Sequence, residues 1–218
     1  MKIVTLALVL VLSVNVPATA QVQARYLDRG NDLIAAGDYA GAERIFRDAL
    51  VTEPHNRVFR AQLALCLVQQ RRHAEADREL ELVLARYSDD LAASWYLALN
   101  RYLDRRYREA AGRFQELLPR LERSAQYPTA HWFIASSLRA LLYANSVTEI
   151  AKAITEQSGG RQSGLSYAEV DTMLDAYRRY VDLEPQAADR AAIEEFVAWV
   201  AKNRPGANAS RWVVGNTR

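Results

Sequence analysis

The chain has 218 residues, of which half are hydrophobic and a quarter are charged, so its composition is that of a folded globular protein. Its 28 lysines and arginines against 26 aspartates and glutamates leave a net charge of +2, which argues against a strongly basic nucleic-acid-binding protein. The single cysteine, Cys66, excludes an intramolecular disulfide and a cysteine-rich metal site.

The N-terminal segment, 1–20, has the layout of a secretory signal peptide. Lys2 supplies a positive charge, an apolar run covers residues 3–12, and Pro17 precedes the small residues 18–20. The run is shorter than the roughly 20 residues that a membrane-spanning helix needs. We therefore expect cleavage after Ala20 and, from the arginine- and alanine-rich composition, export to a bacterial periplasm or the exterior. The alternative is an N-terminal anchor that is not cleaved.

The segment 23–124 is built from three repeats that follow one another without gaps, with a period of about 34 residues. Each unit contains two stretches with the apolar spacing of an amphipathic helix, joined by a tight turn such as Gly37-Asp38. One small residue recurs in each stretch, where it would let two helix backbones approach closely. These positions are Gly30, Ala64 and Ala98 in the first stretch, and Ala42, Ala76 and Ala110 in the second.

The spacing of Gly30, Ala42, Phe46, Ala49 and Pro54 in the first unit resembles a tetratricopeptide repeat (TPR). The second unit (57–90) and the third (91–124) match the pattern more loosely and lack the terminal proline. The resemblance implies an all-α fold, in which helix pairs stack into a right-handed superhelical solenoid with a concave inner face. We predict three such units over residues 21–124.

Beyond residue 124 the period weakens, and residues 125–203 are predicted to form a degenerate fourth unit with an insertion. A helix over 129–143 resembles the first helix of a unit. A second, short helix is predicted over 147–157, followed by a glycine-rich loop over 158–164.

The remaining predicted helices complete the fourth unit and close the solenoid. Ser166 and Glu169 have the spacing of a capping box at the start of a helix that ends before Pro185. A last helix over 187–203 would cover the open apolar end of the stack. Residues 204–218 are predicted to be a loose tail.

The TPR resemblance also implies which residues of the first helix in each unit face the groove. They are Leu27, Asn31 and Ile34 in the first unit, Ala61, Leu65 and Val68 in the second, Trp95, Leu99 and Tyr102 in the third, and Trp132, Ser136 and Arg139 in the fourth. Only Asn31 fits the lysine and asparagine pattern that binds a C-terminal carboxylate in this family, so that mode of binding is not expected. A register shifted by one residue would instead bury Trp95 and Tyr102 in the core, and the sequence leaves both registers open.

Arginines cluster in the turns between the two helices of a unit. Arg71 and Arg72 fall at the same place in the second unit as Arg105, Arg106 and Arg108 in the third. Stacking of the units would bring them into one basic ridge. The ridge is either a solvated row of turns or an edge that binds an anionic protein, a phospholipid headgroup or a polysaccharide.

No residue pattern points to catalysis. The glycine-rich phosphate loops and the nucleophile elbow are missing from the sequence. The histidines His55, His73 and His131 are far apart and lack metal-ligand spacing, and Cys66 lies in the middle of a helix as a packed thiol. We expect no catalytic residue, metal or cofactor, and hence a protein that is not an enzyme.

The sequence therefore predicts an exported TPR adaptor or scaffold that binds a protein or peptide segment in an apolar, aromatic-lined groove. A role in envelope assembly or secretion is inferred by analogy between folds alone. The alternative is a structural subunit that uses the arginine ridge against membrane headgroups or glycan. Neither nucleic acid nor a small-molecule substrate is expected as a partner.

Overall fold

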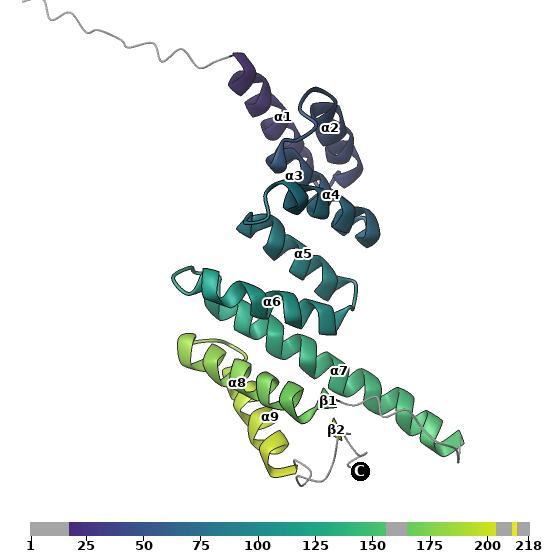
Figure 1. The fold of residues 1–218 in the computed structure, drawn as a ribbon, viewed down its shortest axis with the longest axis vertical. Helices are drawn as coiled ribbons and strands as arrows, with labels where there is room; N and C mark the ends of the chain where they lie inside the picture. Colours follow the sequence, from purple (N-terminus) through teal and green to yellow (C-terminus); the bar gives the residue numbers. More distant parts are fainter. Residues whose placement is uncertain (1–17, 156–164, 204–210, 213–218) are drawn as a thin grey trace, which may run out of the picture.

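The structure is a computed structural model, and it describes residues 18–155, 165–203 and 211–212 (Figure 1). Helices follow one another in chain order: α1 (Ala18–Ala35), α2 (Tyr39–Thr52), α3 (Arg57–Gln69), α4 (His73–Arg86), α5 (Leu91–Leu103), α6 (Tyr107–Leu121), α7 (Tyr127–Thr155), α8 (Tyr167–Leu183) and α9 (Arg190–Asn203). Each packs mainly against its neighbours in sequence, which produces an elongated stack. The predicted all-α solenoid of helix pairs is confirmed.

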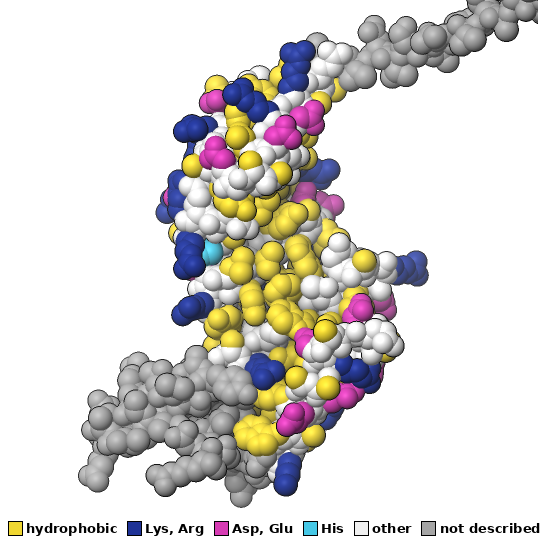
Figure 2. Space-filling model, turned by 180° about the vertical axis from the view of Figure 1, so that it is seen from behind, with side chains coloured by type: hydrophobic (Ala, Val, Ile, Leu, Met, Phe, Trp, Pro, Cys, Tyr) yellow, Lys and Arg dark blue, Asp and Glu magenta, His cyan; other side chains and the backbone are white. Residues whose placement is uncertain are grey.

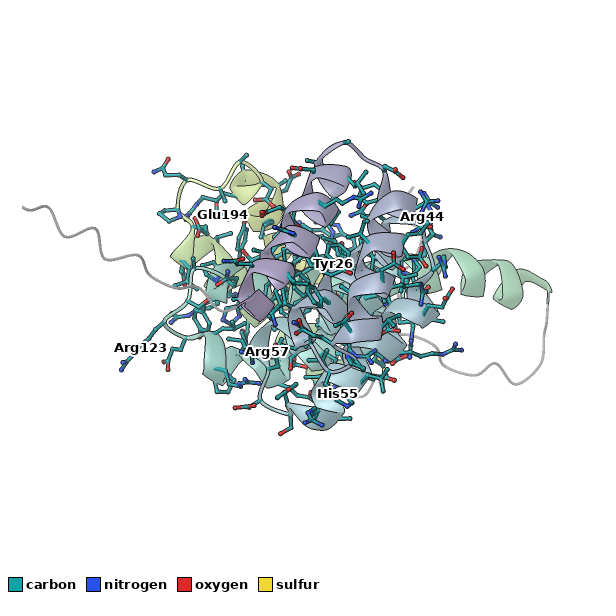
Figure 3. The ribbon with its side chains drawn as sticks, turned by 90° about the horizontal axis from the view of Figure 1, so that it is seen from above. Tyr26, Arg44, His55, Arg57, Arg123 and Glu194 are labelled. Atoms are coloured by element: carbon teal, nitrogen blue, oxygen red, sulfur yellow. The ribbon has the colours of Figure 1, made fainter. Side chains whose placement is uncertain are left out.

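Small residues set the spacing between helices, as the repeat pattern predicts. Ala42, Ala76 and Ala110 are completely buried at the same position of successive units. At Gly30 the approach is closer still, because a Cβ atom there would lie 2.2 Å from Cζ of Phe46. Seen from the N-terminal end of the stack, Tyr26 lies in the interior near α1 and α2, whereas Arg44 points outward from α2 (Figure 3).

Local signals fix where the helices begin. The side chains of Asp38, Asn56 and Asp90 accept hydrogen bonds from backbone N–H groups in the first turns of α2, α3 and α5. The predicted capping box of Ser166 and Glu169 is confirmed at the start of α8. The starts of α2, α3, α5 and α8 are therefore satisfied by side chains close in sequence, whereas α4 and α6 begin without a side-chain cap.

The turn inside each unit uses the left-handed backbone conformation at one recurring position. Gly37, Arg71 and Arg105 have φ angles of 77°, 60° and 62°, and they occupy the same place in three successive units. Glycine adopts this region without a steric penalty, whereas arginine does so at a cost. The turn geometry is thus kept from unit to unit even where the residue is not glycine.

Two hydrophobic clusters share the interior and meet at α5. The N-terminal cluster contains Phe46, Phe59 and Leu80, and it reaches Leu97 of α5. The C-terminal cluster starts at Ala98 of α5 and continues through helices α6 to α9. Because adjacent residues of α5 enter different clusters, this helix holds the two halves of the solenoid together.

A buried ionic network lies where α4, α5 and α6 meet. The Arg101 guanidinium is 2.9 Å from the Asp77 carboxylate and 3.0 Å from that of Glu81, and it also contacts Glu109. The Asn100 amide donates to Asp77 at 2.8 Å and to the backbone carbonyl of His73 at 2.9 Å. The buried side chains of Arg101, Asp77 and Asn100 thus compensate one another's charge and polarity.

The degenerate fourth unit differs from the prediction in its first part. The helices expected over 129–143 and 147–157 are joined in one continuous helix, α7, which has 29 residues and ends at Thr155, where the described part of the chain stops. The connecting residues 144–146 are Ala-Asn-Ser, and they include neither proline nor glycine to end a helix. The predicted glycine-rich loop over 158–164 lies outside the described residues.

The C-terminal end of the stack is closed by α8 and α9. Helix α9 begins three residues later than predicted, and Ile193, Phe196 and Val200 on it are buried. Within the predicted tail, Arg211 and Trp212 form a short strand, β2, that pairs antiparallel with β1 (Leu165–Ser166). The other residues of that tail, and the predicted signal peptide up to residue 17, lie outside the described residues. Residues 18–20 begin α1.

Substitutions of two glycines by alanine test the close spacing of the helices. Gly30→Ala should lower the free energy of unfolding by about 1–2 kcal/mol, because the added methyl group collides with the Phe46 ring. Gly112→Ala, in the middle of α6 with nothing within 4 Å of the new methyl group, should raise it by about 0.5–1 kcal/mol through helix propensity. Urea unfolding of both variants measures the difference, and equal effects would contradict the close approach at Gly30.

Candidate functional site: the inner groove

The odd-numbered helices line one side of the solenoid, and three hollows lie along it in a row. We call this side the inner groove. The first hollow, of about 480 Å³, lies between α3 and α5. The second, about 340 Å³, lies between α5 and the α6–α7 connection. The third, about 310 Å³, lies between α7 and α9, with α5 and α8 contributing. Figure 2 shows a band of hydrophobic side chains across the middle of the molecule.

The first hollow has apolar walls and a charged rim. Val58 and Tyr96 are 45% and 40% exposed, and Leu65 also lines the hollow. At the rim, the Arg57 guanidinium forms an ion pair of 3.1 Å with Asp90. Figure 3 places Arg57 near the edge where His55 marks the turn between α2 and α3. An apolar side chain of a partner would find an uncovered surface here.

The second hollow shares Tyr96 with the first and adds Trp95. One edge of Trp95 packs against the core, with ring centroids 5.1 Å from Phe114 and 6.1 Å from Phe133. Its other side lines the hollow. The sequence leaves two registers open, and the structure combines features of both. Trp95 contributes to the core and to the groove at once.

The third hollow brings together predicted groove residues from two units. Tyr102, Trp132, Ser136 and Arg139 all line it. The Trp132 indole N–H donates a hydrogen bond of 3.0 Å to a carboxylate oxygen of Asp189, and the Arg139 guanidinium lies 4.1 Å from the centre of the Phe196 ring. Burial, with the neighbouring tyrosines, raises the pKa of the Tyr102 phenol, so its hydroxyl stays protonated.

The other residues predicted for the groove lie in less open places. Leu27, Ile34 and Val68 are half-buried against the N-terminal cluster, and Leu99 is half-buried against the C-terminal cluster. Asn31 is exposed on α1, while Ala61 joins Leu65 in the first hollow. The open part of the groove therefore runs from α3 to α9 rather than from α1.

Tyr96, Tyr177 and Asp189 are among the groove residues that sequence reasoning missed. Tyr96 is displaced by one residue from the position that the gap-free register assigns to the groove. An aromatic residue beside Trp95 in the sequence was the available signal for it. Asp189 is distant from Trp132 along the chain, and no local pattern connects the two.

The predicted basic ridge is largely a series of ion pairs that repeats from unit to unit, and we call this series the ionic ladder. Arg72 contacts Glu75 of its own unit and Glu43 of the preceding one, each at 2.6 Å. One unit later, Arg106 contacts Glu109 at 2.6 Å and Asp77 at 2.9 Å. The same pairing thus recurs from one unit to the next.

The other arginines of the ridge are not part of this repeated pairing. Arg108 pairs with Glu169 at 2.6 Å, while Arg71 and Arg105 are exposed at the left-handed turn positions. Figure 2 shows lysine and arginine side chains in a column along one edge. Much of the positive charge in the ridge is therefore matched by carboxylates of the same chain.

His73, His131 and Cys66 have structural surroundings, whereas His55 is exposed in a turn. Nδ1 of His73 is 2.7 Å from the Asn100 side-chain oxygen, and burial, followed by the charge of Arg179, lowers the pKa of His131. Burial and the Glu43 carboxylate raise the pKa of the Cys66 thiol to about 11, so it is not a thiolate at neutral pH. In the parts of the chain that the structure describes, no group of three or more histidine, cysteine or acidic residues could hold a metal ion. None of the described helices is long and apolar enough to cross a lipid bilayer.

Comparison with known proteins agrees with this architecture. The family model for the tetratricopeptide repeat matches residues 33–99. The remainder of the solenoid continues the same helix-pair geometry in the structure, and no curated protein sequence matches the chain significantly.

Solved TPR structures share the fold at low sequence identity. A structure of MamA has a TM-score of 0.59 and 14% identity, with 80% of this chain and 85% of that chain covered. MamA AMB-1 has a TM-score of 0.59 and 15% identity, with 84% of both chains covered. A putative kinesin light chain from Podospora anserina with nearly identical TPR-like repeats gives 0.53 and 14%, covering 87% of this chain and all of its own. Such distant likeness establishes the TPR solenoid fold alone.

The ionic ladder predicts a dependence of stability on acid pH. Burial alone would raise the pKa of Glu43, but hydrogen bonds from Gln70, Arg47 and Arg72 outweigh it and hold the pKa below the ordinary value of 4.5. A carboxyl group with a lowered pKa stabilises the fold above its ordinary pKa, and this contribution is lost as the pH falls through the lowered value. The free energy of unfolding should therefore decrease between about pH 5 and pH 3.

Glu43→Gln isolates this contribution. The variant should be less stable at pH 7 by roughly 1–2 kcal/mol, since it loses charge-assisted hydrogen bonds, and its stability should fall less steeply with acid. Glu116→Gln on α6 is the control, because that exposed carboxylate is 4.0 Å from the Arg113 guanidinium. Urea titrations at several pH values measure both, and parallel pH profiles for Glu43→Gln and the unmodified protein would refute the ladder's role.

Proposed function

We propose that the chain is a TPR adaptor that binds a segment of a partner protein along the inner groove. The observation that carries this proposal is the row of three hollows, together with the exposed aromatic ring of Tyr96 between the first two. Exposed apolar patches of this kind on folded proteins mark interaction surfaces. Tyrosine and tryptophan are also the residues that contribute most strongly to binding at protein interfaces.

The shape of the groove favours an elongated segment over a small molecule. The hollows are open, and the first two share Leu91, Ala92 and Tyr96 of α5, so they form one trough. The helical spacing of Tyr96, Leu99 and Leu103 continues the apolar surface along α5 toward the third hollow. A segment that follows this surface would contact several odd-numbered helices in turn.

The alternative of a structural subunit that acts through the arginine ridge has less support. Arg72 and Arg106 are already paired with carboxylates of the same chain, and Arg108 is paired with Glu169. An anionic headgroup or glycan would have to compete with these pairs. The inner groove, by contrast, presents apolar surface that no other part of the described residues covers.

Cross-linking in the native host tests the groove directly. A photoreactive phenylalanine analogue in place of Tyr96 should cross-link to one partner protein. The same analogue in place of Val51, which is 82% exposed on α2, should not. In purified form, Tyr96→Ala should weaken binding of that partner at least about tenfold with little loss of thermal stability. Cross-linking that is equal at both positions would overturn the proposal.

Trp95→Ala serves as the contrasting variant in the same assay. Because Trp95 also packs against Phe114 and Phe133, its removal should lower the free energy of unfolding by about 2–4 kcal/mol. Tyr96→Ala and Trp95→Ala thus separate loss of binding from loss of folding. Leu82→Ala, at an exposed position of α4, controls for general surface effects.

We also propose that the protein is exported and works in the periplasm or outside the cell. The support is the arrangement of Lys2, the apolar run over 3–12 and the small residues 18–20. A place in envelope assembly or secretion would follow from that location. Mass spectrometry of the protein from its native host should find Gln21 as the first residue. An intact Met1 in the membrane fraction would show the uncleaved-anchor alternative to be correct.

A further inference from the structure

Asp189 carries a negative charge that no cation of the described residues neutralises by an ion pair. It lies in the connection between α8 and α9, where it lines the third hollow. One carboxylate oxygen accepts from the Trp132 indole N–H at 3.0 Å, and the other accepts from the Tyr180 hydroxyl at 3.2 Å. Both donors are neutral, and each carboxylate oxygen can accept a further hydrogen bond. The carboxylate is thus held in place with its charge available.

Aromatic rings surround this carboxylate. Tyr102 and Trp132 have ring centroids 6.3 Å apart, and Tyr177 also lines the hollow. The faces of tryptophan and tyrosine rings attract cations, and the attraction grows when the site is partly shielded from water. An aromatic wall beside an unneutralised carboxylate is therefore suited to a positively charged group.

One cation that lines the hollow, Arg139, already packs on an aromatic ring nearby. The Arg139 guanidinium lies 4.1 Å from the centre of the Phe196 ring on α9. This contact shows that the surroundings accommodate a guanidinium against an aromatic face. The Arg139 charge opposes a second cation nearby, which makes its removal a sensitive test.

We propose that the third hollow accepts the cationic side chain, arginine or lysine, of the segment that binds in the inner groove. The proposal rests on the adaptor function proposed above and adds the chemistry of one partner residue. Apolar side chains would occupy the first two hollows, and the cationic side chain would lie against Tyr102 and Trp132 with its charge toward Asp189. The direction of the bound segment would follow, because the charged hollow is at the C-terminal end of the groove.

A simple probe tests the hollow without knowledge of the partner. N-acetyl-L-arginine methylamide is titrated into the full-length protein labelled with ¹⁵N-tryptophan. The chain has four tryptophans, and the indole N–H signal of Trp132 is assigned by its loss in Trp132→Phe. We expect a saturable shift of this signal with the arginine probe, and none with the glutamate analogue N-acetyl-L-glutamate methylamide. A shift with the glutamate probe alone, or with neither probe, would overturn the proposal.

Three variants sharpen the result. Asp189→Asn keeps an oxygen that can accept from Trp132 but removes the charge, so the arginine probe should bind at least about fivefold more weakly. Asp182→Asn, an exposed position of α8 outside the hollow, should leave binding unchanged. Arg139→Gln should strengthen binding, because it removes the competing charge. Equal binding to Asp189→Asn and the unmodified protein, or weaker binding to Arg139→Gln, would contradict the inference.

The outcome is distinguishable from that of the adaptor proposal. Cross-linking at Tyr96 reports on the first two hollows and does not depend on Asp189. If Tyr96 cross-links a partner while the arginine probe fails to shift Trp132, the adaptor function stands and this inference is wrong. If the probe binds but Tyr96 cross-links nothing, the cation site is present and the adaptor function is wrong. Thermal melts of each variant confirm that it is folded.

Discussion

The buried pair of Arg101 and Asp77 is the contact on which the position of α5, and with it the rest of the solenoid, depends. The Arg101 side chain is 8% exposed and reaches acidic residues on both α4 and α6. Loss of one partner in such a buried pair typically costs about 3–5 kcal/mol, because the other charge is left uncompensated. Apolar packing tolerates small shifts of a helix, whereas this network requires one relative placement of the three.

That placement determines what the inner groove can present. Helix α5 directs Leu97 into the N-terminal cluster and Ala98 into the C-terminal cluster, so two neighbouring faces of the helix are used for packing. Tyr96 and Leu103 of the same helix, which are 40% and 47% exposed, have no core to enter. The aromatic groove is therefore a consequence of a helix that is more hydrophobic than its packing requires. Such an excess of exposed apolar surface points to binding, because a partner that covers it gains the free energy of its burial.

The repeat architecture could be read from the sequence because every unit uses the same local rule. A small residue at the same place in every unit permits close helix approach, and polar turns interrupt the apolar periodicity at fixed places. The details of the groove could not be read in the same way. Whether Trp95 or Tyr96 faces the groove depends on how α5 is rotated about its own axis. That rotation is set by the contact between Arg101 and Asp77, which lie on different helices. The two predicted helices join into α7 because no helix-breaking residue separates them, and this absence is visible in the sequence. The Trp132–Asp189 hydrogen bond has no local signal.

The division of charge over the surface follows from the same repeat. Arginines in the turns of successive units face carboxylates of the preceding unit, so Arg72 and Arg106 are used to join units. Repeat spacing makes such pairs recur wherever both residue types recur, and a cation that is already paired must give up that pair before it can bind anything else. Asp189 lies outside the regular repeat, and its carboxylate is held by two neutral donors. Recognition of a charged group of the partner is therefore expected where the repeat is interrupted, near α9, rather than along the regular ridge that the repeat itself neutralises.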